Sequence, residues 1–190
     1  MGDPKKARKK YSRPRSPWRA DQLAQELYLL GNFGLRNKRE LWKAETQLSS
    51  MRKQARTLLA ATEQVRLREE KKLLDSLRRK GLVAEGASLD DILSLTVEDV
   101  LARRLQSMVF KKGMALSPLH ARQLIVHGHI VVGERMIKTP GYGINRLEEP
   151  EIKLVGIREP KPPSEAAAPP AAEPSSQAPE APSAGPALQK

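Results

Sequence analysis

The side chains of this chain that could do chemistry are basic and hydrogen-bonding groups between residues 103 and 129. On one helix over 97–112, with about 100° between successive residues, Arg104, Ser107 and Lys111 share a face that Arg103 flanks. Two arginines and a lysine along one face suit the phosphates of a nucleic acid. Taken alone, Arg104 and Lys111 could also be ordinary solvated charges.

A second helix is predicted to begin after Ser117, which is an N-cap residue followed by Pro118 at the first helical position. His120, Gln123 and His127 fall within about 60° of one another on one face of this helix. The residues expected to face the core are Ala121, Leu124 and Ile125. The unpaired amides at the start of the helix also suit a phosphate. The two helices together indicate a surface for a polyanion.

Metal and catalytic chemistry are the alternatives for the histidines at positions 120, 127 and 129. The chain has no cysteine, and no inward-facing carboxylate completes a tetrahedral ligand set, so we expect no metal and no cofactor. A histidine acting as a general base would need a nucleophile or a substrate pocket beside it, and neither is evident. The sequence therefore predicts a protein that is not an enzyme.

The charge of the chain favours the same chemistry. The 190 residues include 34 Lys and Arg and 22 Asp and Glu, a formal net charge of +12. The last thirty hold only two Lys and three Glu, so the positive charge belongs to the first 160. Such an excess attracts a polyanion, and each neutralised phosphate releases counterions. We favour nucleic acid as the partner over a merely solvated charged surface.

Other classes of protein find little support. No window has the ~18 apolar residues that a membrane span needs, and the N-terminus lacks an apolar signal core. We therefore expect no membrane association and a cytoplasmic location. Only seven residues are aromatic, fewer than binders that stack single-stranded bases usually use.

Helices are predicted for most of the first hundred residues. The first, over 20–30, is expected to bury Leu23, Leu27 and Leu30. The next opens with a capping box from Asn37 to Glu40. Its apolar stripe is Leu41, Ala44, Leu48, Met51, Ala55 and Leu58. A third helix, near 62–80, is expected to bury Val65, Leu73, Leu74 and Leu77 and to stop at Gly81.

Further capping boxes and a hairpin follow. The pairs Ser88 with Asp91 and Thr96 with Asp99 each predict a short helix. Short strands are expected over 129–132 and 135–137, joined by Gly133 and Glu134, with a further one within 151–156. The fold class is therefore mainly α with a small α+β unit.

Both ends of the chain are expected to be disordered. Residues 1–19 form a basic arm with three prolines, which should order only against a partner, although a solubilising tail is the alternative. Residues 161–190 are rich in Pro, Ala, Glu, Ser and Gln and have no periodic apolar pattern.

Two segments carry a family resemblance. Arg103-Arg104-Leu105-Gln106, Ser117-Pro118-Leu119-His120-Ala121-Arg122-Gln123-Leu124-Ile125 and Gly128-His129-Ile130-Val131-Val132 resemble the S-four RNA-binding domain. Gly34-Leu35-Arg36-Asn37-Lys38-Arg39-Glu40-Leu41-Trp42 resembles the signature of the archaeal and eukaryotic branch of the small-subunit ribosomal protein S-four family. The resemblance runs from about residue 3 to 158.

The resemblance implies a domain organisation and a set of RNA contacts. A helical domain over 20–102, completed by 145–160, is interrupted by an S-four domain over 103–144. The implied contacts are Arg36, Lys38, Arg39, Arg103, Arg104, Lys111, Ser117, His120, Arg122, Gln123 and His129. Some relatives bind zinc through cysteines near the N-terminus, and this chain has none.

The resemblance also implies a function. We expect a structural constituent of the small ribosomal subunit that binds small-subunit rRNA at a multi-helix junction of the five-prime domain. It should nucleate assembly, contribute to translational accuracy, and lie beside neighbouring ribosomal proteins near the mRNA entry channel.

Three rival functions stay open. One is an S-four-domain RNA-binding factor that associates with the ribosome without being part of it. Another is an enzyme such as a pseudouridine synthase, which would need a separate catalytic domain. A DNA-binding basic coiled coil is disfavoured because glycines and caps cut its helices short.

Overall fold

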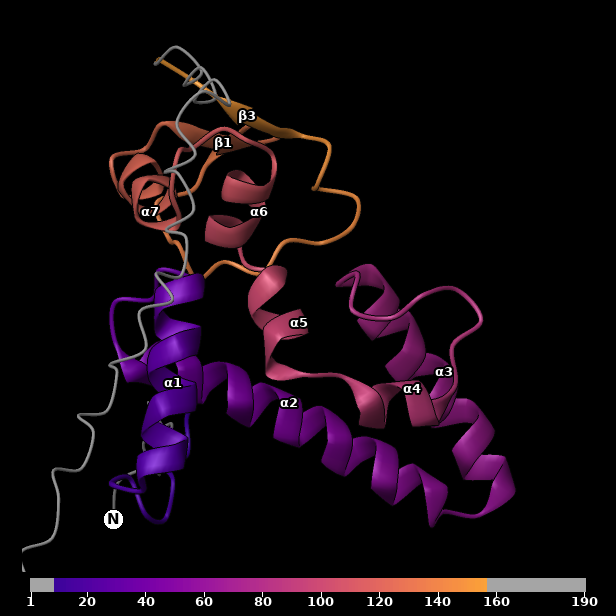
Figure 1. Ribbon diagram of the computed structural model, residues 1–190. Coiled ribbons are helices and arrows are strands. Elements are labelled where there is room, and N and C mark those ends of the chain that lie inside the picture. The colour runs from indigo at the N-terminus through magenta and orange to yellow at the C-terminus, as the bar shows by residue number, and fades with distance from the viewer. Residues whose placement is uncertain (1–8, 157–190) are drawn as a thin grey trace, which may run out of the picture.

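The computed structural model describes residues 9–156. Its elements in chain order are α1 (Ala20–Asn32), α2 (Lys38–Leu59), α3 (Glu63–Arg79), α4 (Leu89–Ser94), α5 (Val97–Ala102), α6 (Leu105–Lys111), α7 (Pro118–Val126), β1 (Ile130–Val132), β2 (Arg135–Met136) and β3 (Ile152–Leu154). Figure 1 shows helices α1 to α5 on one side and α6, α7 and the sheet on the other. The predicted fold class, mainly α with a small α+β unit, is confirmed for these residues.

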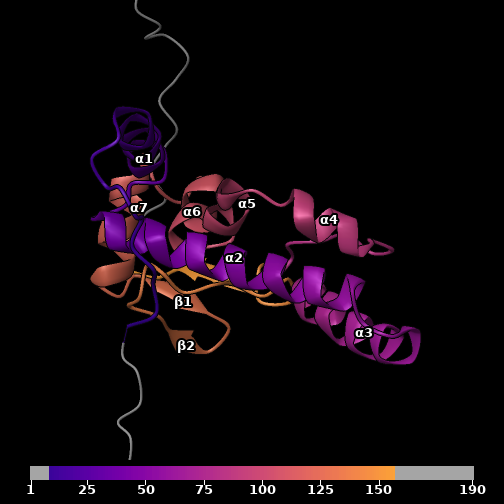
Figure 2. The ribbon, with the colours of Figure 1, turned by 90° about the horizontal axis from the view of Figure 1, so that it is seen from below.

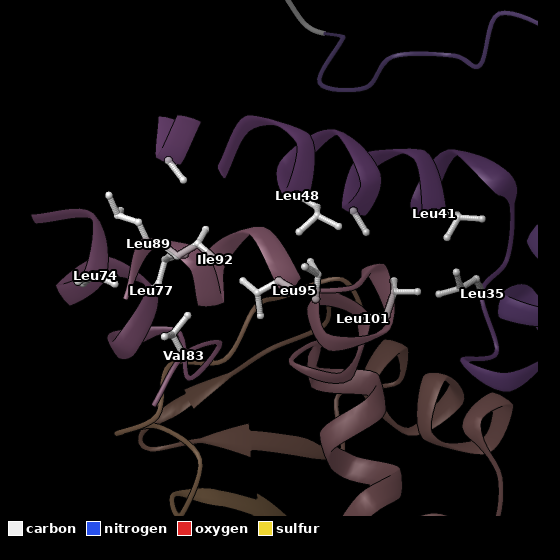
Figure 3. Packing of buried hydrophobic residues seen from close by; sticks show 13 residues of the cluster. Leu35, Leu41, Leu48, Leu74, Leu77, Val83, Leu89, Ile92, Leu95 and Leu101 are labelled. Carbon is white, nitrogen blue, oxygen red and sulfur yellow. The ribbon is translucent and has the colours of Figure 1, made fainter. Parts of the chain in front are cut away.

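Helix α2 is the long axis of the helical domain, which we define as residues 20–102. Its apolar stripe faces α3, α4 and α5, and Figure 3 shows Leu41 and Leu48 pointing toward Leu101 and Ile92. The predicted stripe is confirmed, because four of its residues are buried and Met51 and Leu58 pack against the same cluster. Figure 2 shows α7 near the N-terminal end of α2 and α3 along its C-terminal end.

Two predicted core positions in this domain are wrong. Leu27 is 61% exposed, since α1 turns the face with Leu29, Leu30 and the carboxylate of Glu26 toward the core. Val65 is 51% exposed because it lies in the first turn of α3, at the tip of the α2–α3 hairpin. Periodicity alone could not identify these exposed positions, since it does not say how far a helix is covered.

The predicted capping boxes have mixed outcomes. Ser88 with Asp91 and Thr96 with Asp99 form as expected, with 2.8 Å from each N-cap amide to the aspartate. The box from Asn37 to Glu40 is wrong, because Asn37 makes no side-chain cap hydrogen bond. The Glu40 carboxylate instead accepts from two arginines of the second part of the chain.

The single helix predicted over 97–112 is also wrong. Helix α5 ends at Ala102 and α6 begins at Leu105, with Arg104 extended at φ −79° and ψ 148°. The segment 140–143 lies against this break, and the Leu105 amide donates to the Tyr142 carbonyl at 2.8 Å. Ser107 therefore turns inward and donates to the Leu101 carbonyl at 2.7 Å, so it does not share an exposed face with Lys111.

Residues 103–156 form a compact α+β domain. Helices α6 and α7 pack on an antiparallel sheet of order β2-β1-β3, with Val131 opposite Met136 and Lys153. Its own apolar cluster includes Leu105, Ile125 and Ile130. The predicted start of α7 is confirmed, since Ser117 caps it by accepting from the His120 amide and Pro118 is its first residue.

The segment 145–160 was expected to complete the helical domain. Its first residues contact that domain, and the Arg146 amide donates to the Arg79 carbonyl at 2.8 Å. Strand β3, however, pairs with β1, and Ile152 is buried in the cluster of the α+β domain. The segment thus serves both domains up to residue 156, beyond which it lies outside the described residues.

Part of the basic arm lies against α2 rather than being disordered. The Tyr11 ring stacks on Trp42 with 6.0 Å between centroids, and the Ser12 amide donates to Thr46 Oγ1 at 3.0 Å. Stacking buries apolar ring surface, which offsets the entropy of ordering this segment. Residues 1–8 of the arm and the predicted disordered tail, 161–190, lie outside the described residues.

Candidate RNA-binding surface

Two of the predicted RNA contacts, Arg104 and Arg122, bind a carboxylate of the protein itself at the boundary between the domains. Arg104 Nη2 donates to Glu40 Oε2 at 2.6 Å, and Arg122 Nη2 donates to Glu40 Oε1 at 2.7 Å. The side chains of Arg104, Arg122 and Glu40 are only 13%, 20% and 17% exposed. These guanidinium groups are therefore mostly committed to a carboxylate of α2, and little of either is open to solvent.

The buried amide of Gln106 extends this contact. Its Nε2 donates to the carbonyls of Gly34 at 2.8 Å and Pro118 at 2.9 Å, and Phe33 O lies 3.2 Å away. Its Oε1 accepts from Arg122 Nη1 at 3.3 Å. Because Gln106 is buried, these partners are what satisfy its polar atoms. We call Glu40, Arg104, Gln106 and Arg122 the Glu40 cluster.

The electrostatics of this cluster favour the ionised carboxylate. Burial by itself raises the pKa of Glu40, but hydrogen bonds from Arg122 and Arg104 outweigh it, so the pKa lies below its ordinary value. The cluster is thus a charged contact at neutral pH.

Arg103 and Lys38 are also engaged within the chain. Arg103 donates through Nε to the Lys80 carbonyl at 3.0 Å and through Nη1 to Glu149 at 2.9 Å. Lys38 pairs with the buried Glu26 at 2.8 Å. Burial by itself raises the pKa of Glu26. Hydrogen bonds from Lys38 and Trp42 together lower this pKa by more than burial raises it, so the pKa lies below its ordinary value. These two residues hold elements together, whatever else they contact.

The remaining predicted contacts are more open to solvent, apart from Ser117. Arg36 and Arg39 are exposed around the start of α2, and Lys111 and Gln123 are exposed on α6 and α7. His120 is half-buried, and its Nδ1 accepts from the Leu116 amide at 3.2 Å, so Nε2 is the nitrogen left for a contact with RNA. His129 is half-buried, and the Ser117 hydroxyl is used as the helix cap.

A cleft of about 700 Å³ lies between α2 and the segment 139–145. Its lining includes Arg104 and Arg122 from the predicted set. It also includes Lys43, Gln47, Gln54 and Lys80, which sequence reasoning did not single out as contacts. The sequence could have indicated three of them, because Lys43, Gln47 and Gln54 are spaced four and seven residues apart and therefore share one face of a helix. The tertiary fold was needed to bring Lys80 beside them.

Residues 9–156 offer neither a metal site nor a membrane span. No group of three or more His, Asp or Glu side chains is placed to hold a metal ion there. None of the helices described is long and apolar enough to cross a membrane.

Two family models match the chain in succession. A model described as "Ribosomal protein S4/S9 N-terminal domain" matches residues 5–102, and one described as "S4 domain" matches residues 103–146. The chain belongs to the ribosomal protein S4 family. The boundary between the two matches lies where α5 ends and α6 begins, and the S4 match covers α6, α7, β1 and β2 of the α+β domain.

Curated relatives support the same assignment. The chain is 53% identical over 156 residues to "Small ribosomal subunit protein uS4" of Ignicoccus hospitalis, covering 82% of this chain and 92% of the relative. Its identity to the protein of that name from Hyperthermus butylicus is 54%, over 78% of this chain and 85% of the relative. For Cenarchaeum symbiosum the identity is 52%, over 82% and 76%. The family resemblance is confirmed, and membership of a ribosomal protein family agrees with the prediction of a non-enzyme.

Proposed function

We propose that this chain is a structural constituent of the small ribosomal subunit that binds small-subunit rRNA directly. The observation that carries the proposal is that relatives more than half identical over most of the chain are named small ribosomal subunit proteins. The net charge of +12 and the S4 domain support an RNA partner.

The exposed cations suggest how the RNA is held. Arg39 and Lys43 are one helical turn apart on α2, and both are exposed. Lys111 and Gln123 are exposed on the α+β domain, so each domain offers its own polar contacts. Double-stranded RNA is recognised mostly through phosphates, 2′-hydroxyls and shape. A protein with contacts on two domains in a fixed arrangement suits two RNA helices that meet at an angle.

The predicted contacts fall into two roles in this proposal. Direct contact with RNA is assigned to the more accessible residues, which are Arg36, Arg39, Lys111, His120, Gln123 and His129. Holding the RNA-binding surfaces in place is assigned to the internally bonded residues, which are Lys38, Arg103, Arg104, Ser117 and Arg122.

The finer functional expectations belong to the same proposal. The chain would bind a multi-helix junction of the five-prime domain, act early in assembly and contribute to translational accuracy. It would lie beside other ribosomal proteins near the mRNA entry channel, in the cytoplasm.

The first test measures RNA affinity against salt. For the double variant Arg39→Ala/Lys43→Ala we expect weaker binding to five-prime-domain RNA and a slope of log K against log salt that is shallower by roughly 2. The double variant Arg68→Ala/Lys71→Ala, which removes the same charge from α3, should change the slope less. Equal slopes for wild type and Arg39→Ala/Lys43→Ala would refute the assigned contact.

The second test separates a constituent from a visiting factor. A constituent sediments with small subunits at one copy each through a high-salt wash, and chemical footprints on their RNA change when it is omitted. Loss of the chain in the wash would favour the RNA-binding factor that only associates with ribosomes.

A further inference from the structure

The two domains have separate apolar cores and meet through polar groups. The cluster of the helical domain ends at Leu101, and the cluster of the α+β domain begins at Leu105. The two residues that connect them, Arg103 and Arg104, are not helical. Apolar burial is non-directional and here lies within each domain, so it leaves the angle between the domains to other contacts.

The Glu40 cluster supplies such a contact on one side of the connection. Glu40 belongs to α2, whereas Arg104 is the N-cap residue of α6 and Arg122 lies on α7. One carboxylate thus receives donors from two elements of the other domain, one at each oxygen. Arg122 also reaches Oε2 through Nη1 at 3.3 Å, so its contact is two-pronged and fixes direction as well as distance.

Close packing beside the carboxylate limits the movement further. Gly34, from the helical domain, is so near Pro118 of α7 that a Cβ on Gly34 would lie 2.8 Å from Pro118 Cβ. Gln106 donates across the same boundary to the Gly34 carbonyl. On the other side of the connection, Arg103 joins Lys80 to Glu149, and Arg146 pairs with Glu85 at 3.2 Å, but that pair is well exposed.

We propose that Glu40 is a positioning residue that fixes the angle between the two domains and thereby sets the selectivity for an RNA junction over a simple duplex. The junction part of this inference rests on the function proposed above. A buried ion pair is a weak source of stability but can specify one arrangement. If the domains sample many angles, only the competent fraction binds a junction, and the apparent Kd rises in inverse proportion to that fraction.

Removal of the Glu40 carboxylate leaves the two arginines at the domain boundary without their counter-charge. Arg104 Nη1 already has no hydrogen-bond partner among the described residues. In Glu40→Gln the amide cannot accept at both ends, and two guanidinium groups remain largely buried without a counter-charge. Their charges are then better solvated by opening the boundary, which leaves the two apolar cores intact.

The first experiment measures the angle directly. The chain has no cysteine, so Ser49→Cys on α2 and Val126→Cys on α7 place spin labels at two exposed positions in an otherwise thiol-free protein. We expect one narrow distance distribution for the wild-type background and a broader or shifted one for Glu40→Gln and Glu40→Ala. The control is Glu45→Gln, which removes a partly buried carboxylate from the same helix without an interdomain partner among the described contacts.

Circular dichroism of the same samples checks that both domains stay folded, since a merely structural role would lower helix content rather than broaden the distance. If Glu40→Ala loses helix content, the distance distribution of Glu40→Gln is the deciding measurement. An unchanged narrow distribution in folded Glu40→Gln overturns the proposal.

The second experiment measures Kd for a five-prime-domain junction and for a linear duplex of equal length. We expect Glu40→Gln to raise the Kd for the junction roughly tenfold, as when a tenth of the molecules have the competent angle. The Kd for the duplex should not rise, because loss of the carboxylate adds one unit of positive charge. An equal change for both RNAs would overturn the role in selectivity. If the wild type itself shows no preference for the junction, the proposed function fails, while the distance measurement still decides whether Glu40 sets the angle.

Discussion

Replacing Gly34 with alanine tests the close contact between the domains most directly. Gly34 has φ +57°, and a Cβ there would meet Pro118 Cβ at 2.8 Å, Gln106 Nε2 at 3.0 Å and the Pro118 carbonyl carbon at 3.1 Å. The left-handed conformation costs an alanine about 1–2 kcal/mol. The contact with Pro118 is with a ring carbon and backbone that cannot move aside easily, and overpacking of this kind costs about 1–3 kcal/mol.

Two other glycines separate these contributions. Gly113 has φ +73° but nothing within 4 Å of its added Cβ, so Gly113→Ala should cost only the conformational part, about 1–2 kcal/mol. Gly31 lies in α1, has no positive φ and meets nothing within 4 Å. Gly31→Ala should therefore stabilise the chain by up to about 1 kcal/mol.

Urea unfolding followed by circular dichroism at 222 nm gives the free energies of unfolding of the wild type and the three variants under one set of conditions. The expected order of stability is Gly31→Ala, wild type, Gly113→Ala and then Gly34→Ala. The difference between Gly113→Ala and Gly34→Ala isolates the close approach to Pro118. If these two variants are equally stable, the boundary between the domains is looser than its geometry indicates, and the reasoning fails.

Two further predictions concern a helix cap and pH. Ser117→Ala removes the acceptor for the His120 amide and should cost about 1 kcal/mol of unfolding free energy, whereas Ser117→Asp should retain most of it. The pKa values of Glu26 and Glu40 are lowered in the folded state, so the unfolded state binds more protons in acid. Their stabilisation is present above the ordinary carboxyl pKa of 4.5 and is lost as pH falls through the folded values. Urea midpoints between pH 7 and 3 should therefore fall less for Glu40→Gln than for wild type, whereas Glu45→Gln should steepen the fall, because burial raises the pKa of Glu45. Parallel curves for wild type and Glu40→Gln would show that the cluster contributes nothing to the pH dependence.

The sequence predicted a helix or strand well where residues within a few turns of it determine where it begins and which face it buries. The start of α7 follows from Ser117 and Pro118, whose side chain and ring act within one turn. The apolar stripe along α2 is defined by the spacing of six residues, so one exposed position among them would not change the prediction of an amphipathic helix. The break between α5 and α6 could not be predicted, because the segment 140–143 that competes for the Leu105 amide is about forty residues away in the chain.

In the candidate RNA-binding surface, too, the sequence predicted what depends on nearby residues and missed what depends on distant ones. Types and spacings identified the basic character of residues 103–129 and the family. They did not distinguish arginines that face solvent from arginines that face a carboxylate. Arg104 and Glu40 are 64 residues apart in sequence, and Arg122 and Glu40 are 82 apart. No periodicity within one helix carries information over such separations.

The sequence by itself determined the charge, the helices with strong local caps and the family, because each depends on composition or on residues within a few turns. Only the tertiary structure decided which cations remain available to a partner. A guanidinium binds whichever anion the fold brings within hydrogen-bonding distance, and for Arg104 and Arg122 that anion is the Glu40 carboxylate of the other domain.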